Sequence, residues 1–212
     1  MLPFIVFLLS SCLIYFSYTH TQNYLTYNTI QFDKLTTDKQ YYVVKNIIKG
    51  VYLCLLVIAA TLLLIPGICN GYWDNDAIRI FASMYVSNDF VGLYKVNRLP
   101  TSTRLHHTVS FVFMLVAWNV DFQNSNVGQL LVLYTYFSAL SFPVNLYLGL
   151  RLCYPNMEWL KNYSKYIYMV SCIVNWWLQY YWIVYDKNTL LYLCFLSAIV
   201  LDDIILLKWL WK

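Results

Sequence analysis

The sequence predicts an all-α integral membrane protein with about seven transmembrane helices. Of the 212 residues, 60% are hydrophobic and only 11% are charged, whereas soluble domains carry about a quarter charged residues. The mean hydropathy is +0.53. The charged residues lie mainly between apolar runs of roughly 20 residues, the length that a membrane-spanning helix needs. No polar segment is long enough for a separate soluble domain.

The predicted spans follow one another from the N-terminus. Residues 2–18 are apolar but lack the basic start and cleavage site of a signal peptide, so we expect a retained first span, with cleavage as the alternative. We divide the chain into an N-terminal span and polar loop, 1–39, and a transmembrane domain, 40–212. The second and third spans are expected at about 43–66 and 77–96, and the fourth from 101–103 to about 119. The fifth covers about 128–152, with a break at Pro143. The sixth ends at about 185, and the seventh runs from a turn at 186–188 to the C-terminus.

Polar residues near the ends of these spans have expected roles of their own. The hydroxyl side chains of Thr101, Ser102 and Thr103 are candidate N-caps of the fourth span. Lys45 and Lys49 lie on the first turns of the second span, from which their side chains can reach the lipid head groups.

Basic residues are divided unequally between the two sides of this topology. One side receives all 14 lysines and arginines except Arg79 and Lys187. Because cytosolic loops are rich in lysine and arginine, we expect the N-terminus to face the lumen or the exterior and the C-terminus to face the cytosol. The expected location is the endoplasmic reticulum or a related endomembrane. The sequon that begins at Asn162 then lies in a cytosolic loop and stays unglycosylated.

The segment Arg104–Ser110 holds two of the three histidines, at the start of the fourth span. His106 and His107 lie four and three residues before Ser110, so that on a helix the hydroxyl and the imidazoles share one face. Histidine titrates near neutral pH and serves as a general acid or base. The pair is therefore a candidate catalytic site, with an interfacial anchor as the alternative.

Buried polar residues of the other spans are further candidates, because ionisable groups within a membrane are costly. Asp89, in the third span, can orient a histidine or make a structural hydrogen bond. Ser138, Ser141 and Asn145 form a polar stripe beside Pro143 that can line a lipid cavity or join helices. Asp202 and Asp203 point about 100° apart on a helix, so we do not expect both at one site.

Other classes of site are not expected. The six cysteines form no CxxC pair, so we predict neither a disulfide framework nor a metal site. The few basic residues lie between membrane spans, and no nucleic-acid partner is expected. The expected partner is membrane lipid.

The chain resembles the TLC-domain family, which includes the ceramide synthases, and is most similar to its small single-domain members. The resemblance rests on Asp89 in the run Met84–Asp89, on the pair His106 and His107, and on the run Leu140–Leu146. It covers most of the chain from about residue 40 onward. It implies a bundle of helices around a lipid-accessible cavity and, for the histidine pair, acyl transfer from acyl-CoA to an amine.

The chain departs from the family pattern at two points. Many members have an arginine and a histidine in the second span, whereas this chain has Lys45, Asn46 and Lys49 there and no histidine between residues 21 and 105. The other departure is from the ceramide synthases. Their signature continues one span later with a His-Asp-x-x-Asp element, whereas residues 128–150 contain no histidine and no acidic residue. Two hypotheses follow. In the first, the protein is an acyl-CoA-dependent acyltransferase with His106, His107 and Asp89 as catalytic candidates; in the second, it is a non-catalytic regulator of membrane lipid composition or trafficking.

Overall fold

The computed structural model describes residues 1–185 and 190–212, and over these ranges it contains ten helices and no strand. The predicted all-α fold is thereby confirmed, whereas the predicted turn at 186–188 lies outside the described residues. The helices are α1 (Leu2–Asn28), α2 (Ile30–Asp33), α3 (Thr37–Leu63), α4 (Ile65–Cys69), α5 (Asn75–Lys95), α6 (Thr101–Ala117), α7 (Asn126–Ala139), α8 (Phe142–Leu150), α9 (Glu158–Tyr185) and α10 (Leu190–Leu210).

Each predicted span coincides with a helix, or with α7 and α8 together. Among the described residues, three helical segments are long and apolar enough to cross a membrane: Leu2–Asn28, Thr37–Leu63 and Asn126–Leu150. This finding is compatible with a membrane protein, and crossing by the other helices stays a prediction. The predicted loop after the first span is shorter than expected, because α1 continues to Asn28.

Side chains cap the starts of α5 and α7. The Asp74 carboxylate accepts hydrogen bonds of 3.0 Å from the backbone at the start of α5, and Ser125 does the same for α7 at 3.1 Å. For α6 the predicted hydroxyl cap is wrong. This helix already begins at Thr101, and its N-cap position is held by Pro100, whose side chain makes no capping hydrogen bond.

The predicted break near Pro143 is confirmed. Helix α7 ends at Ala139, and α8 begins at Phe142 with Pro143 in its first two positions. A proline there cannot donate the backbone hydrogen bond that would continue α7. The Ser164 hydroxyl of α9 donates to the Pro143 carbonyl at 2.9 Å, so the break is joined to the neighbouring helix.

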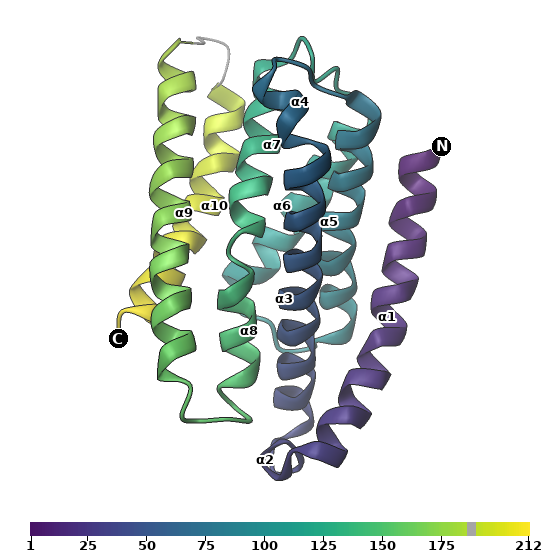
Figure 1. The fold of residues 1–212 in the computed structure, drawn as a ribbon, viewed down its shortest axis with the longest axis vertical. Coiled ribbons are helices and arrows are strands. Elements are labelled where there is room, and N and C mark those ends of the chain that lie inside the picture. Colours follow the sequence, from purple (N-terminus) through teal and green to yellow (C-terminus); the bar gives the residue numbers. More distant parts are fainter. Residues whose placement is uncertain (186–189) are drawn as a thin grey trace.

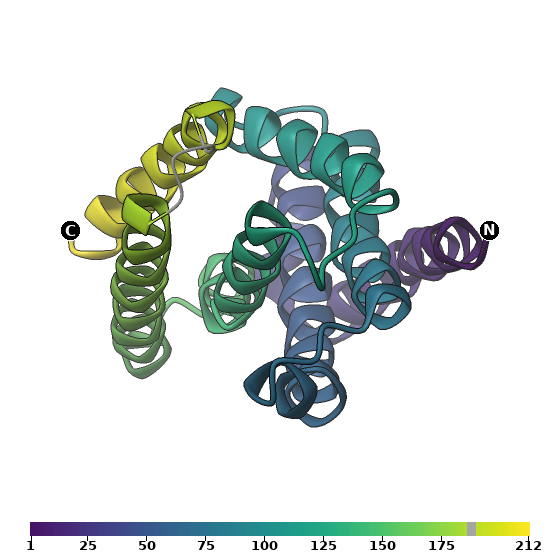
Figure 2. The ribbon, with the colours of Figure 1, turned by 90° about the horizontal axis from the view of Figure 1, so that it is seen from above.

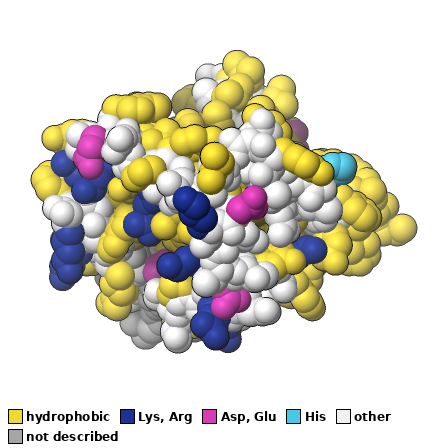
Figure 3. All heavy atoms as spheres, turned by 90° about the horizontal axis from the view of Figure 1, so that it is seen from below, with side chains coloured by type: hydrophobic (Ala, Val, Ile, Leu, Met, Phe, Trp, Pro, Cys, Tyr) yellow, Lys and Arg dark blue, Asp and Glu magenta, His cyan; other side chains and the backbone are white. Residues whose placement is uncertain are grey.

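The helices form one bundle (Figure 1). Viewed along the bundle, α7 and α8 lie inside an arc made by α9, α10, α6 and α5, and α1 lies outside (Figure 2). Helix α1 packs mainly against α5. Lysine and arginine side chains gather at the end of the bundle that carries the C-terminus (Figure 3), and we call this the basic end.

Helices α3 and α8 approach each other closely at two glycines. A Cβ atom on Gly50 would lie 2.6 Å from the Leu146 side chain, and one on Gly149 would lie 3.0 Å from the Val43 carbonyl oxygen and 2.8 Å from Ile47. Real Cβ atoms essentially never come within 3.0 Å of another heavy atom, so any larger residue at either position would require the Leu146 or Ile47 side chain to move.

The Gly149→Ala variant is expected to unfold more easily than the wild type. The added methyl group forces α8 away from the α3 backbone, which costs about 1–3 kcal/mol. Thermal unfolding in detergent measures this loss. Val51→Ala is the control, since Val51 is 51% exposed on the outer side of α3 and its truncation is expected to change stability by at most about 0.5 kcal/mol. Equal melting temperatures for the wild type and Gly149→Ala would contradict the close approach.

Candidate functional site

Asp89 lies at the centre of a buried charged cluster contributed by three helices. The Lys49 ammonium of α3 donates to Oδ1 of Asp89 on α5. On the other side, Nδ1 of His107, on α6, lies 3.0 Å from Oδ2 of Asp89. The side chains of Asp89 and His107 are only 1% and 2% exposed. The carboxylate therefore joins α3, α5 and α6 at one point.

The predicted reach of Lys45 and Lys49 to the lipid head groups is wrong. These residues are only 4% and 8% exposed. The reason is the start of the helix: α3 begins at Thr37, so Lys45 lies about 12 Å inside it instead of on its first turn. Both ammonium groups are thus held among the helices, Lys49 by Asp89.

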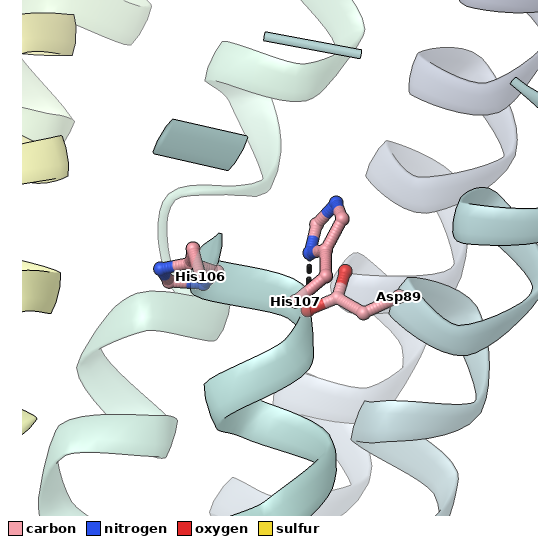
Figure 4. A group of neighbouring side chains, drawn as sticks. All are labelled: Asp89, His106 and His107. Atoms are coloured by element: carbon pink, nitrogen blue, oxygen red, sulfur yellow. Dashed lines mark ion pairs between the residues drawn. The ribbon is translucent and has the colours of Figure 1, made fainter. Parts of the chain in front are cut away.

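His106 faces a different part of the bundle from His107. Figure 4 shows its ring turned away from Asp89, as expected for neighbouring helical residues, which point about 100° apart. Its Nδ1 atom lies 3.9 Å from Oδ2 of Asp202 on α10. The three predicted catalytic candidates are thereby divided: Asp89 is the partner of His107, and Asp202 is the acidic neighbour of His106.

The same three residues have ligand atoms within 4.8 Å of one another, a spacing that a metal site also shows. Their surroundings favour a different role. Lys49 already binds one oxygen of Asp89, and Lys45 brings a second positive charge to the adjoining cavity. Two ammonium groups repel a divalent cation, so we do not assign a metal to this cluster.

A polar cavity of about 320 Å³ lies beside the charged cluster. It is lined by residues of α3, α5, α6, α7, α8, α9 and α10, and the break between α7 and α8 opens onto it. The predicted polar stripe of Ser138, Ser141 and Asn145 lies on its wall. The other polar or charged residues that line it are Tyr42, Lys45, Asn46, Lys49, Tyr85, Ser102, Thr103, His106, His107, Arg151, Tyr168, Asp202 and Asp203.

Asp202 and Asp203 both line this polar cavity, so the expectation that they cannot share one site is wrong. The cavity is wide enough to receive neighbouring side chains of α10 that point in different directions. Asp203 accepts hydrogen bonds from the hydroxyls of Tyr134, on α7, and Tyr168, on α9, the second at 2.8 Å. The carboxylates that residues 128–150 lack are thus supplied to the cavity by the last helix, α10.

An apolar pocket adjoins the polar cavity and runs toward the opposite end of the bundle. It holds about 110 Å³ and is lined mainly by aliphatic and aromatic side chains of α3, α5, α6, α7 and α10. Of the residues that the structure describes, only Tyr85 and His106 line both the pocket and the cavity. His106 therefore stands at the boundary between a polar and an apolar space.

Ser110 lies on the wall of the apolar pocket. Its hydroxyl donates to the His106 backbone carbonyl at 3.0 Å, a hydrogen bond within the helix. Within the described part of the chain, no hydrogen bond joins the hydroxyl to an imidazole, so the geometry does not form the Ser–His pair that the spacing allowed. Ser110 is placed to contact a ligand, not to act as an activated nucleophile.

Sequence reasoning missed the cations of the site. Lys45 and Lys49 are spaced i,i+4 in an otherwise apolar span, which indicates one charged face turned toward the protein interior. Arg151 directly follows α8, and its guanidinium stacks 4.5 Å from the Trp209 ring. No local pattern marks its place in the cavity, because α10 supplies that ring.

Comparison with known proteins gives no relative for this site. No protein-family model matches the chain, and neither a curated protein nor a solved structure is significantly similar to it.

Proposed function

We propose that this chain is a lipid-handling membrane protein of the TLC type, and that its first candidate activity is acyl transfer from acyl-CoA to a lipid amine or hydroxyl. The observation that carries the proposal is the position of His106 between the polar cavity and the apolar pocket. A lipid has the same division, with a polar head and an apolar chain. Its reactive linkage would lie next to the imidazole.

In the proposed reaction, His106 accepts the proton of the lipid amine or hydroxyl as that group attacks the thioester carbon. The new amide or ester bond forms, the carbon–sulfur bond breaks, and the proton goes on to the departing thiolate. Asp202, with Oδ2 3.9 Å from Nδ1 of His106, would orient the ring and stabilise its protonated form. His107 is held by Asp89 and would keep α6 in position.

The proposal includes the full seven-span topology, with the basic end facing the cytosol. Its support is the gathering of lysine and arginine at the end of the bundle where acyl-CoA would enter (Figure 3). The N-terminus also lies in the upper half of the bundle and the C-terminus in the lower half, as an odd number of spans requires (Figure 1).

A glycosylation experiment tests this topology. Asn162 is exposed at the start of α9, near the basic end, and we expect it to carry no glycan when the protein is made in microsomes. A flexible sequon-bearing segment inserted after Gly71, at the opposite end, should be glycosylated, and the same segment inserted after Asn156 should not. Gel mobility before and after glycosidase treatment shows whether each protein carries a glycan. A glycan on the segment inserted after Asn156 would show that the topology is the reverse of the proposed one.

A second candidate function is non-catalytic lipid binding that regulates membrane composition. The observation that favours it is the buried cluster of Lys49, Asp89 and His107, in which charged groups neutralise one another and join three helices. Such a cluster stabilises a binding scaffold without any reaction. In this case the polar cavity holds a head group and no bond changes.

Lipid analysis separates the two candidates. Lipid profiles are compared between cells that express the wild type and cells that express the double variant His106→Ala/His107→Ala at equal levels. A lipid species that appears only with the wild type supports the transferase. Lipid that co-purifies with the wild type, without any new species in the cells, supports the regulator. Absence of both contradicts the proposed function.

A further inference from the structure

The polar cavity contains two cationic side chains that form no ion pair with a carboxylate among the described residues. Lys45 is 4% exposed and forms no ion pair there, whereas the charge of neighbouring Lys49 is balanced by Asp89. Arg151 also forms no ion pair among the described residues; its Nε atom is buried without a hydrogen-bond partner, and its charge lies over the Trp209 ring. A buried ammonium without a counter-charge is costly, so Lys45, with the half-buried Arg151 on the wall of the same cavity, indicates an anionic ligand.

The start of α6 adds hydrogen-bond donors to the same cavity. Pro100, Ser102 and Thr103 line it, and the Pro100 position provides no side-chain cap. The first backbone N–H groups of a helix have no partner within the helix, and they carry the positive end of its dipole. Uncapped helix starts of this kind bind phosphate and other anions.

The carboxylates of the cavity do not cancel this preference. Asp203 accepts hydrogen bonds from two tyrosines, and Asp202 is nearest to His106. Both belong to α10, whereas Lys45 belongs to α3 and Arg151 directly follows α8. The two carboxylates therefore have hydrogen-bond or imidazole neighbours of their own, and among the described residues neither of them forms an ion pair with Lys45 or Arg151.

We propose that the polar cavity binds the phosphate group of a lipid head group, with Lys45 and Arg151 as its counter-charges and the first N–H groups of α6 as donors. The inference rests on the proposed lipid-handling function and deepens it by naming the chemistry of the head group. The chain of the same lipid would pass His106 and Tyr85 into the apolar pocket.

The spacing along α6 favours a lipid phosphate over the phosphates of acyl-CoA. Ser102 and His106 are separated by one helical turn, a rise of about 6 Å. In a glycerophospholipid the glycerol unit alone separates the phosphate from the acyl linkage, which suits this distance. In acyl-CoA the long pantetheine arm separates the nearest phosphate from the thioester.

A binding experiment with two matched lipids tests the inference. The full-length protein is purified in a phosphate-free detergent, and a fluorescent lipid is displaced by lysophosphatidic acid or by the monoacylglycerol with the same chain. The wild type should bind the phosphate-bearing lipid about tenfold or more tightly than the monoacylglycerol, the effect of one charge-assisted contact. Lys45→Gln and Arg151→Gln should each reduce this ratio severalfold and leave monoacylglycerol binding unchanged.

Two control variants separate recognition from folding. Lys45→Arg retains the charge and should retain the preference, and Lys39→Gln removes an exposed lysine at the basic end and should change nothing. Thermal unfolding verifies that every variant is folded.

Three outcomes would overturn the inference. Equal binding of the two lipids to the wild type would show that the chain is bound without recognition of phosphate, and the proposed function would survive. Displacement by acyl-CoA but not by lysophosphatidic acid would assign the cations to the thioester substrate. Failure of every lipid to bind would refute the proposed function together with the inference.

Discussion

The His106→Gln variant is expected to form product about 100-fold or more slowly than the wild type, because it loses the proposed general base. Glutamine keeps a polar side chain at the boundary between the polar cavity and the apolar pocket but cannot accept a proton at neutral pH. Lipid binding, measured by displacement of a fluorescent lipid, should remain within a few-fold of the wild type. Mass spectrometry of the product formed by purified protein measures the rate.

The neighbouring histidine is the matched control. His107 faces Asp89 and not Asp202, so His107→Gln should lower the thermal stability and reduce the rate far less than His106→Gln does. Asp202→Asn should give an intermediate rate, since it removes only the group that orients His106. A larger rate loss for His107→Gln than for His106→Gln would transfer the proposed role to the other imidazole.

Among variants with a single substitution at the site, Asp89→Asn is expected to be the least stable. It leaves Lys49 as a buried ammonium without its counter-charge, which costs roughly 3–5 kcal/mol of unfolding free energy. Lys49→Met should also destabilise the protein, and the double variant Lys49→Met/Asp89→Asn should recover part of the loss because no charge is left unpaired. Unfolding in detergent, analysed as a double-mutant cycle, measures the coupling.

An exposed ion pair of the same chain serves as the control for the buried pair of Lys49 and Asp89. Arg98 and Asp38 lie 3.0 Å apart at the basic end, with 84% and 38% of their side chains exposed. Pairs of this kind contribute at most about 1 kcal/mol, so Asp38→Asn should change the melting temperature little. Equal losses from Asp38→Asn and Asp89→Asn would mean that the buried pair does not hold the helices together.

The helices could be predicted well from the sequence because their determinants are local. Apolar runs, Pro143 and the polar connections each act within a few residues, and the positions of the helices follow from them. The errors have local causes too. A start of α3 at Thr37 instead of about Val43 moved Lys45 and Lys49 from the helix end into the interior.

The composition of the candidate site depends on packing between distant segments, and much less of it could be predicted. The sequence identified His106, His107 and Asp89 by their rarity in apolar spans, but the choice of partner depends on how α6 turns. In the rotation that α6 adopts, His106 faces Asp202 of α10 and His107 faces Asp89 of α5. Asp202 lies 96 positions after His106, and no pattern in the chain joins them.

The apolar pocket has a consequence for which lipids the proposed function would accept. Its α6 wall runs from His106 to Ala117, a rise of about 16 Å, and Ile68 and Phe122 line it beyond the far end of that wall. A chain whose linkage is held at His106 would meet these side chains after a fixed length. The pocket would then act as a ruler and select lipids by the length of their chains as well as by their head groups.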